Sequence, residues 1–205
     1  MNLRPAAPED RPRLYEICLL TGADGQDATA LHRDPHLLGH VYVGPYLAFA
    51  RDLAFVLEDD DEVLGYVLGV ADTAAFEREC EERWWPELRR RYPAGTFPPG
   101  TPDAAVAGLL HAPPRADPPV LDAYPAHLHV DLLPAAQGGG YGRRLLAHLF
   151  GALEERGAAG VHLGVSARNE RALGFYRRLG FTTLQADGDG ALLGRRLRRA
   201  PHVRA

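Results

Sequence analysis

The sequence predicts one α/β domain with a mixed, mostly antiparallel twisted sheet of six or seven strands and helices on both faces. Three observations support this fold class. Two pairs of apolar runs, at residues 53–70 and 181–197, are each split by an acidic or glycine-rich turn, which is typical of antiparallel hairpins. Residues 127–150 have the pattern of a strand, a glycine-rich turn and a helix. The chain has 205 residues, enough to bury one sizeable core.

The N-terminal part is predicted to contain a short strand followed by helices. Residues 1–4 form the strand, and a helix opens at Pro8 with acidic residues in its first turn. Residues 22–34 have the composition of a loop. Residues 36–50 are expected to form short helices that break at Gly44-Pro45.

Residues 73–121 are predicted to be a helical insertion between the third and fourth strands. Residues 73–92 have the pattern of a long amphipathic helix, which Pro86 kinks. Residues 104–110 form a short helix between two proline-rich segments. Because a long insertion inside a domain is usually functional, we expect this one to shape a substrate pocket or a dimer contact. The alternative is a solvent-exposed insertion without a functional role.

The composition of the chain argues against several classes of partner and favours phosphate binding. A net charge of -4 implies no general attraction to nucleic acid or to anionic membranes, so neither is expected as a partner. The chain has no signal segment and no apolar run of membrane-spanning length, which favours a cytoplasmic protein. Cys18 and Cys80 stand alone, and no metal site is expected. All 23 basic residues are arginine, a side chain well suited to holding phosphates.

The glycine-rich turn is the strongest local signal. Pro134 cannot donate to a sheet, so the strand before the turn should end by Leu133. Helix-start amides, the helix dipole and flexible glycines together favour a phosphate or pyrophosphate site. A Walker loop is excluded because the chain has no lysine, and a dinucleotide fingerprint lacks its third glycine, where Arg143 stands. The remaining pattern is Gln-x-x-Gly-x-Gly, from Gln137 to Gly142. Its alternative is a glycine turn without a ligand.

A second motif follows at residues 169–181. It reads Asn-x-x-Ala-x-x-Phe-Tyr-x-x-Leu-Gly-Phe. With the glycine loop, it resembles the two signatures of the GNAT superfamily, the acyl-CoA-dependent N-acetyltransferases. The resemblance covers residues 50–72 and 120–197. The segments at 55–59 and 65–69 and the Trp84-Trp85-Pro86 helix also resemble the acetyltransferase-like C-terminal domain of eukaryotic O-GlcNAc hydrolases.

The resemblance implies a GNAT fold over residues 1–198, standing alone with a tail at 199–205. It also implies that acetyl-CoA is the cosubstrate and that an amine-bearing acceptor receives the acyl group directly. The cosubstrate would lie in a V between the two central strands, beginning near Leu132 and Val165. A monomer and a homodimer both stay open.

The resemblance further implies a set of cofactor-binding residues. The pyrophosphate would be held by Gln137, Gly138, Gly139, Gly140, Tyr141, Gly142 and Arg143. Leu132 and Leu133 would offer their backbone to the pantetheine arm and polarise the thioester carbonyl. Asn169 would bind the same arm, with helix capping as its alternative role, and Ala172 and Phe175 complete the site.

Three residues are the main catalytic candidates. Tyr176 matches the family tyrosine that protonates the leaving thiolate, and its alternative is a half-buried core residue. The family's usual glutamate base is replaced by Ala126. His127 and His129 lie on one face of the strand by its period of two and are the candidate bases. Their alternative is a structural role on the sheet face. Asp131 shares that face, and Asp122 and Tyr124 are further candidates for the base.

The sequence therefore predicts an acetyl-CoA-dependent N-acetyltransferase. One alternative is a catalytically weak or inactive acetyl-CoA-binding module that serves as a sensor or interaction domain. A weaker alternative is a nucleotide-binding protein that uses the same loop for another phosphate. The sequence does not identify the acceptor.

Overall fold

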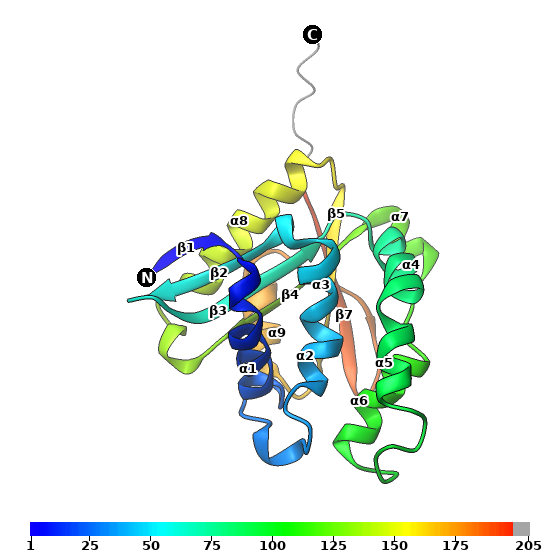
Figure 1. Cartoon of the computed structure of the whole chain (residues 1–205). Coiled ribbons are helices and arrows are strands. Elements are labelled where there is room, and N and C mark those ends of the chain that lie inside the picture. Colours follow the sequence, from blue (N-terminus) through cyan, green and yellow to red (C-terminus); the bar gives the residue numbers. More distant parts are fainter. Residues whose placement is uncertain (199–205) are drawn as a thin grey trace.

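The computed structural model describes residues 1–198, which form a seven-stranded sheet in the order β1-β2-β3-β4-β5-β7-β6 (Figure 1). Its strands are β1 (Asn2–Pro5), β2 (Ala54–Asp59), β3 (Glu62–Val70), β4 (Ala126–Leu132), β5 (Gly160–Ser166), β6 (Thr182–Ala186) and β7 (Gly190–Arg196). Neighbouring strands are antiparallel except β4 and β5, which are parallel. The predicted mixed, mostly antiparallel sheet is confirmed. The tail predicted at 199–205 lies outside the described residues.

The parallel contact between β4 and β5 is short. Only Ala126 with Val161 and His127 with His162 are paired. Both strands continue beyond these pairs without facing each other, so they have separated before Leu132 and Val165. The result is a V-shaped gap in the middle of the sheet, which opens earlier along the strands than the sequence suggested.

Helices cover both faces of the sheet. One face carries α1 (Arg11–Thr21), α2 (Leu37–Tyr42) and α3 (Gly44–Phe49), and the other carries α8 (Tyr141–Glu155) and α9 (Glu170–Arg178). The amphipathic α8 buries Leu145, Leu146, Leu149 and Leu153 completely. Short 3-10 turns complete the connections: η1 (Pro8–Asp10), η2 (Thr29–Leu31), η3 (Arg51–Leu53) and η4 (Pro134–Ala136).

The insertion is helical, as predicted, but its elements differ from the expectation. It contains α4 (Thr73–Arg83), α5 (Trp85–Arg91), α6 (Pro102–His111) and α7 (Pro118–Ala123). The expected kinked helix is two helices that meet at Trp84, because Pro86 occupies the first turn of α5, where no N–H is needed. Helix α7 was expected to be a proline-rich connection. None of the helices within residues 1–198 combines the length and apolarity that a membrane span requires.

Candidate functional site

The N-terminus of α8 presents unoccupied hydrogen-bond donors. Helices α4, α6 and α9 each begin with a side-chain cap, from Asp72, Thr101 and Asn169. Helix α8 has Gly140 at its N-cap position and therefore has no side-chain cap. Within residues 1–198, none of the backbone N–H groups from Gly138 to Arg143 donates a hydrogen bond. A row of free amides at the positive end of a helix dipole is a site for an anion.

The loop conformation depends on its glycines. Gly138 and Gly140 have φ of 84° and 79°, a left-handed conformation that other residues adopt only with strain. Gly142 lies against Leu132 and Phe175, so an added Cβ would approach their side chains to 3.0 and 3.2 Å. The loop is therefore folded tightly against the end of β4 and against α9, while its outer amides stay exposed.

The open edge of β4 also carries free backbone groups. The N–H of Leu133 donates to the carbonyl of Leu64 on β3 at 2.9 Å. Backbone groups alternate between the two edges of a strand, so those of Val130 and Leu132 point into the gap. The Gln137 side chain donates to the Leu132 carbonyl at 2.7 Å and ties the loop to this edge. Leu133 therefore has no free donor, whereas the amides of Val130 and Leu132 remain candidates for the thioester carbonyl.

Tyr176 lies on α9 beneath the gap. Its ring packs against Phe181 at 5.5 Å between centroids. Burial, with a further contribution from the Asp131 carboxylate, raises the pKa of Tyr176. Its hydroxyl makes no hydrogen bond to the described residues. Among these residues, His40 Nε2 is the one side-chain polar atom that is both fully buried and without a partner, so the unpartnered Tyr176 hydroxyl must be in contact with solvent. A protonated, unpartnered hydroxyl at this position can donate to a sulfur in the gap.

The remaining predicted residues surround the same opening. Asn169 caps α9, accepting from the Ala172 N–H at 3.0 Å. Ala172 and Phe175 are half-buried on the side of α9 that packs into the core. Arg143 is exposed at the start of α8, beside the free amides. Tyr141 holds the Arg144 guanidinium over its ring, 5.5 Å from the centroid.

A cavity of about 420 Å³ lies on the face of the sheet that carries α2 and α3, opposite α8 and α9. Its floor is formed by β4 and β5 on both sides of the gap. Helices α2 to α6 and the 113–117 segment, which lies between α6 and α7, form the walls. The chain thus has a donor-rich loop on one side of the gap and a cavity on the other.

His127 faces this cavity but has both ring nitrogens engaged. Its Nδ1 lies 2.8 Å from the Thr73 hydroxyl, which itself donates to the Pro125 carbonyl at 2.7 Å. Thr73 has only one proton to donate, so we assign the Nδ1 proton to His127. Its Nε2 then accepts from the Tyr46 hydroxyl at 2.6 Å. Burial lowers the pKa of His127 well below its usual value. His127 is therefore a neutral histidine whose lone pair is taken.

His129 is the freer of the two candidate bases. Its ring contacts the rings of Tyr42 and Tyr46 edge-on, with centroids 5.7 and 5.3 Å apart, and it lines the cavity. Burial lowers the pKa of His129 to about 4. None of the side-chain hydrogen bonds among the described residues involves it. A neutral imidazole with a free lone pair therefore borders the gap.

His162 is a site residue that sequence reasoning missed. It pairs with His127 across the two central strands and lines the cavity. Its Nδ1 must donate to the Tyr124 carbonyl, 2.8 Å away, so Nε2 carries the lone pair of the neutral ring. The available signal was a histidine within an otherwise apolar strand. Asp122 and Tyr124, the other candidate bases, do not line the cavity.

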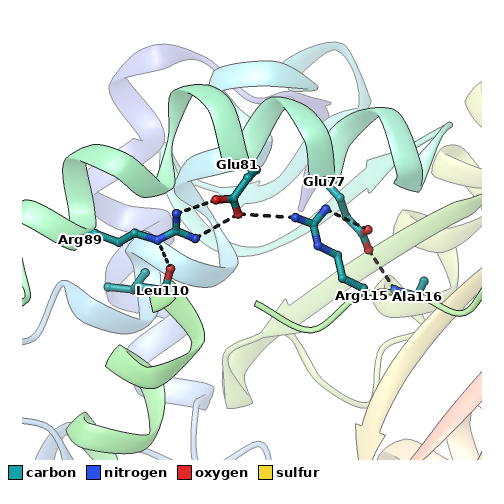
Figure 2. Close-up of polar contacts among 6 residues, drawn as sticks. All are labelled: Glu77, Glu81, Arg89, Leu110, Arg115 and Ala116. Carbon is teal, nitrogen blue, oxygen red and sulfur yellow. Dashed lines mark hydrogen bonds and ion pairs between the residues drawn. The ribbon is translucent and has the colours of Figure 1, made fainter. Parts of the chain in front are cut away.

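The 113–117 segment, which lines the cavity, is held by charged and polar side chains. Figure 2 shows Arg115 between Glu77 and Glu81 of α4, with guanidinium-to-carboxylate distances of 3.6 and 3.5 Å. Glu77 also accepts from the Ala116 N–H at 3.1 Å. On the other side, Gln185 of β6 donates to Asp117 at 2.9 Å. The segment is therefore attached both to α4 and to the C-terminal part of the sheet.

Within residues 1–198, no three His, Cys, Asp or Glu side chains are grouped so as to hold a metal ion.

Comparison with known proteins places this geometry in context. The model of the acetyltransferase (GNAT) family matches residues 26–181. Protein O-GlcNAcase of Rattus norvegicus is 29% identical over 96% of this chain, which spans 22% of that relative's length. The structure of SsHAT is 42% identical, with a TM-score of 0.89 over 95% of this chain and 97% of SsHAT. The structure of yncA from Salmonella typhimurium, with its cofactor acetyl-CoA, has a TM-score of 0.56 at 18% identity, covering 99% of this chain and 98% of yncA.

Proposed function

The chain belongs to the acetyltransferase (GNAT) family, and from this premise we propose that it is an acetyl-CoA-dependent N-acetyltransferase that passes an acetyl group directly to an amine. The observation that carries the proposal is the row of free amides from Gly138 to Arg143 at the start of α8. These amides suit the diphosphate of coenzyme A, and they lie beside the gap between β4 and β5. Coenzyme A would supply the activated thioester.

In the proposed reaction, the amine nitrogen attacks the thioester carbonyl carbon as the carbon–sulfur bond breaks. The amides of Val130 and Leu132, which point into the gap, would donate to the carbonyl oxygen as it gains negative charge. His129 would accept the proton that the nitrogen loses, and Tyr176 would give a proton to the leaving sulfur. His127 would act as a positioning residue, because its lone pair is occupied by Tyr46.

A second candidate function is an acetyl-CoA-binding module with little or no transfer activity. It is favoured by the lowered pKa values of His127 and His129 and by Ala126 at the position of the usual glutamate. Such a module would keep the cosubstrate site but lack an efficient base.

Isothermal titration with acetyl-CoA, ATP and NAD tests the shared part of both candidates. We expect acetyl-CoA to bind and the two nucleotides to bind far more weakly. Acetyl-CoA that failed to bind would eliminate both candidates, and preferential binding of ATP or NAD would favour a nucleotide-binding protein instead.

Release of free thiol over a panel of amines then separates the transferase from the module. We expect Tyr176→Phe to lower kcat about 10²–10⁴-fold while leaving the affinity for acetyl-CoA unchanged. Thiol release equal in both proteins would remove Tyr176 from the mechanism.

A further inference from the structure

The side chains that line the cavity indicate the chemical class of the acceptor. We propose that it binds a small aromatic primary amine whose nitrogen is attached to the ring, and that this amine is the acyl acceptor. The inference rests on the proposed function and adds the substrate class. A volume of about 420 Å³ falls within the range of about 300–1,000 Å³ that is usual for small-molecule pockets.

The walls of the cavity are aromatic. Tyr42 and Tyr46 come from α2 and α3, Phe76 from α4 and Trp85 from α5. The rings of Tyr46 and Phe76 lie 4.8 Å apart at an interplanar angle of 37°. Aromatic rings pack favourably against other rings in offset and edge-on arrangements. These walls therefore suit a flat aromatic ligand.

The charged side chains of the cavity are already engaged. Glu77 and Asp117, the carboxylates that line it, accept from the Ala116 N–H and the Gln185 amide respectively. Glu77 also faces the Arg115 guanidinium at 3.6 Å. A polyamine carries several ammonium groups and needs several free carboxylates to replace their hydration. The described residues of the cavity do not offer them.

The cover of the cavity disfavours a polypeptide acceptor. The 113–117 segment is joined to α4 through Glu77 (Figure 2) and to β6 through Gln185. A peptide would need an open groove with backbone partners along both sides, whereas the 113–117 segment walls this cavity on one side. A compact ligand needs neither.

The basicity of the site agrees with an amine that arrives uncharged. Burial lowers the pKa of His129 to about 4, so His129 is a poor base for an alkylammonium, whose pKa is about 10. An amino group attached directly to an aromatic ring is neutral near pH 7. Its nitrogen needs to lose a proton only as the new bond forms, when it has become acidic enough for His129 to accept the proton.

The experiment measures binding and turnover separately on the full chain. Saturation-transfer NMR, with and without acetyl-CoA, follows 4-methylaniline, spermidine and a lysine-containing peptide, and thiol release gives kcat/KM for each. We expect 4-methylaniline to bind in the cavity and to exceed the other two at least about 10-fold in kcat/KM. Preference for spermidine or the peptide, or absence of 4-methylaniline binding, would overturn the proposal.

Matched variants locate the ligand. Phe76→Ala removes a cavity wall, whereas Phe97→Ala removes a half-buried ring of the same insertion that stacks on Tyr92 away from the cavity. We expect the first to weaken amine binding at least about 10-fold and the second to leave it unchanged, and equal effects would argue against this cavity. If acetyl-CoA does not bind, the proposed function fails, while amine binding without acetyl-CoA still decides whether the cavity recognises this ligand class.

Discussion

Replacing His40 by phenylalanine should make the protein more resistant to acid. His40 is 8% exposed, and its Nε2 is buried without a hydrogen-bond partner. Burial, assisted by the nearby Arg91, lowers the pKa of His40 from 6.5 to about 4. Between the two pKa values, His40 is protonated in the unfolded chain but neutral in the folded chain. The free energy of unfolding therefore falls as the pH drops from the pKa of the unfolded state toward that of the folded state. A phenylalanine keeps the edge-on contact with Tyr15 and cannot titrate.

The size of the effect follows from the two pKa values. With 6.5 unfolded and about 4 folded, this histidine costs about 2 kcal/mol at pH 5 and about 3 kcal/mol at pH 4, and almost nothing above pH 7.5. Urea denaturation of both proteins at pH 7.5 and pH 5 measures it. Any pH-independent effect of the new ring cancels when the stability difference at one pH is subtracted from that at the other.

We expect the variant to gain about 2 kcal/mol on the wild type between pH 7.5 and pH 5. A stability difference that stays constant over this interval would show that His40 titrates normally in the folded chain, and the assigned burial effect would be wrong. Acetyl-CoA binding at pH 7.5 serves as a control, because His40 lies outside the proposed site and its replacement should not change the affinity.

Three further substitutions test the loop and the core. Gly140→Val forces a β-branched residue to φ 79° and should weaken acetyl-CoA binding at least about 10-fold by titration, and unchanged affinity would mean that the loop geometry is unimportant. Gln137→Ala removes the bond to the Leu132 carbonyl, so we expect an affinity loss of about 3–10-fold; a larger loss would indicate direct contact with the ligand. Leu149→Ala empties a fully buried position against Gly69 and should lower the unfolding free energy by about 2–5 kcal/mol in urea, whereas a loss below 1 kcal/mol would contradict the packing.

The strands and the main helices could be predicted because their signals are local. The Asp59–Asp61 turn lies between two apolar runs, and α8 has apolar residues at helical spacing. Helix α7 was missed for an equally local reason. Pro118 and Pro119 made the segment look like a connection, yet both lie in the first turn of a helix, where a missing N–H costs nothing.

The candidate site also has one part that the sequence could predict and one part that it could not. The glycine loop is continuous in sequence, so its amides and its position before α8 could be anticipated. The cavity could not, because it is built from elements far apart in the chain: Tyr46 meets His127 across 81 residues. Strand periodicity correctly put His127 and His129 on one face, but it gave no information about what covers that face. The engaged lone pair of His127 depends on Thr73 and Tyr46, which only the folded chain brings together.

The two-pair contact between β4 and β5 has a consequence for how the molecule holds together. Strands β1 to β4 form one half-sheet and β5 to β7 the other, and few backbone bonds join them. Any molecule seated in the gap would touch both halves and act as a mechanical brace. We therefore expect the bound cosubstrate to make the whole domain more rigid, and the domain to become more flexible when the cosubstrate leaves.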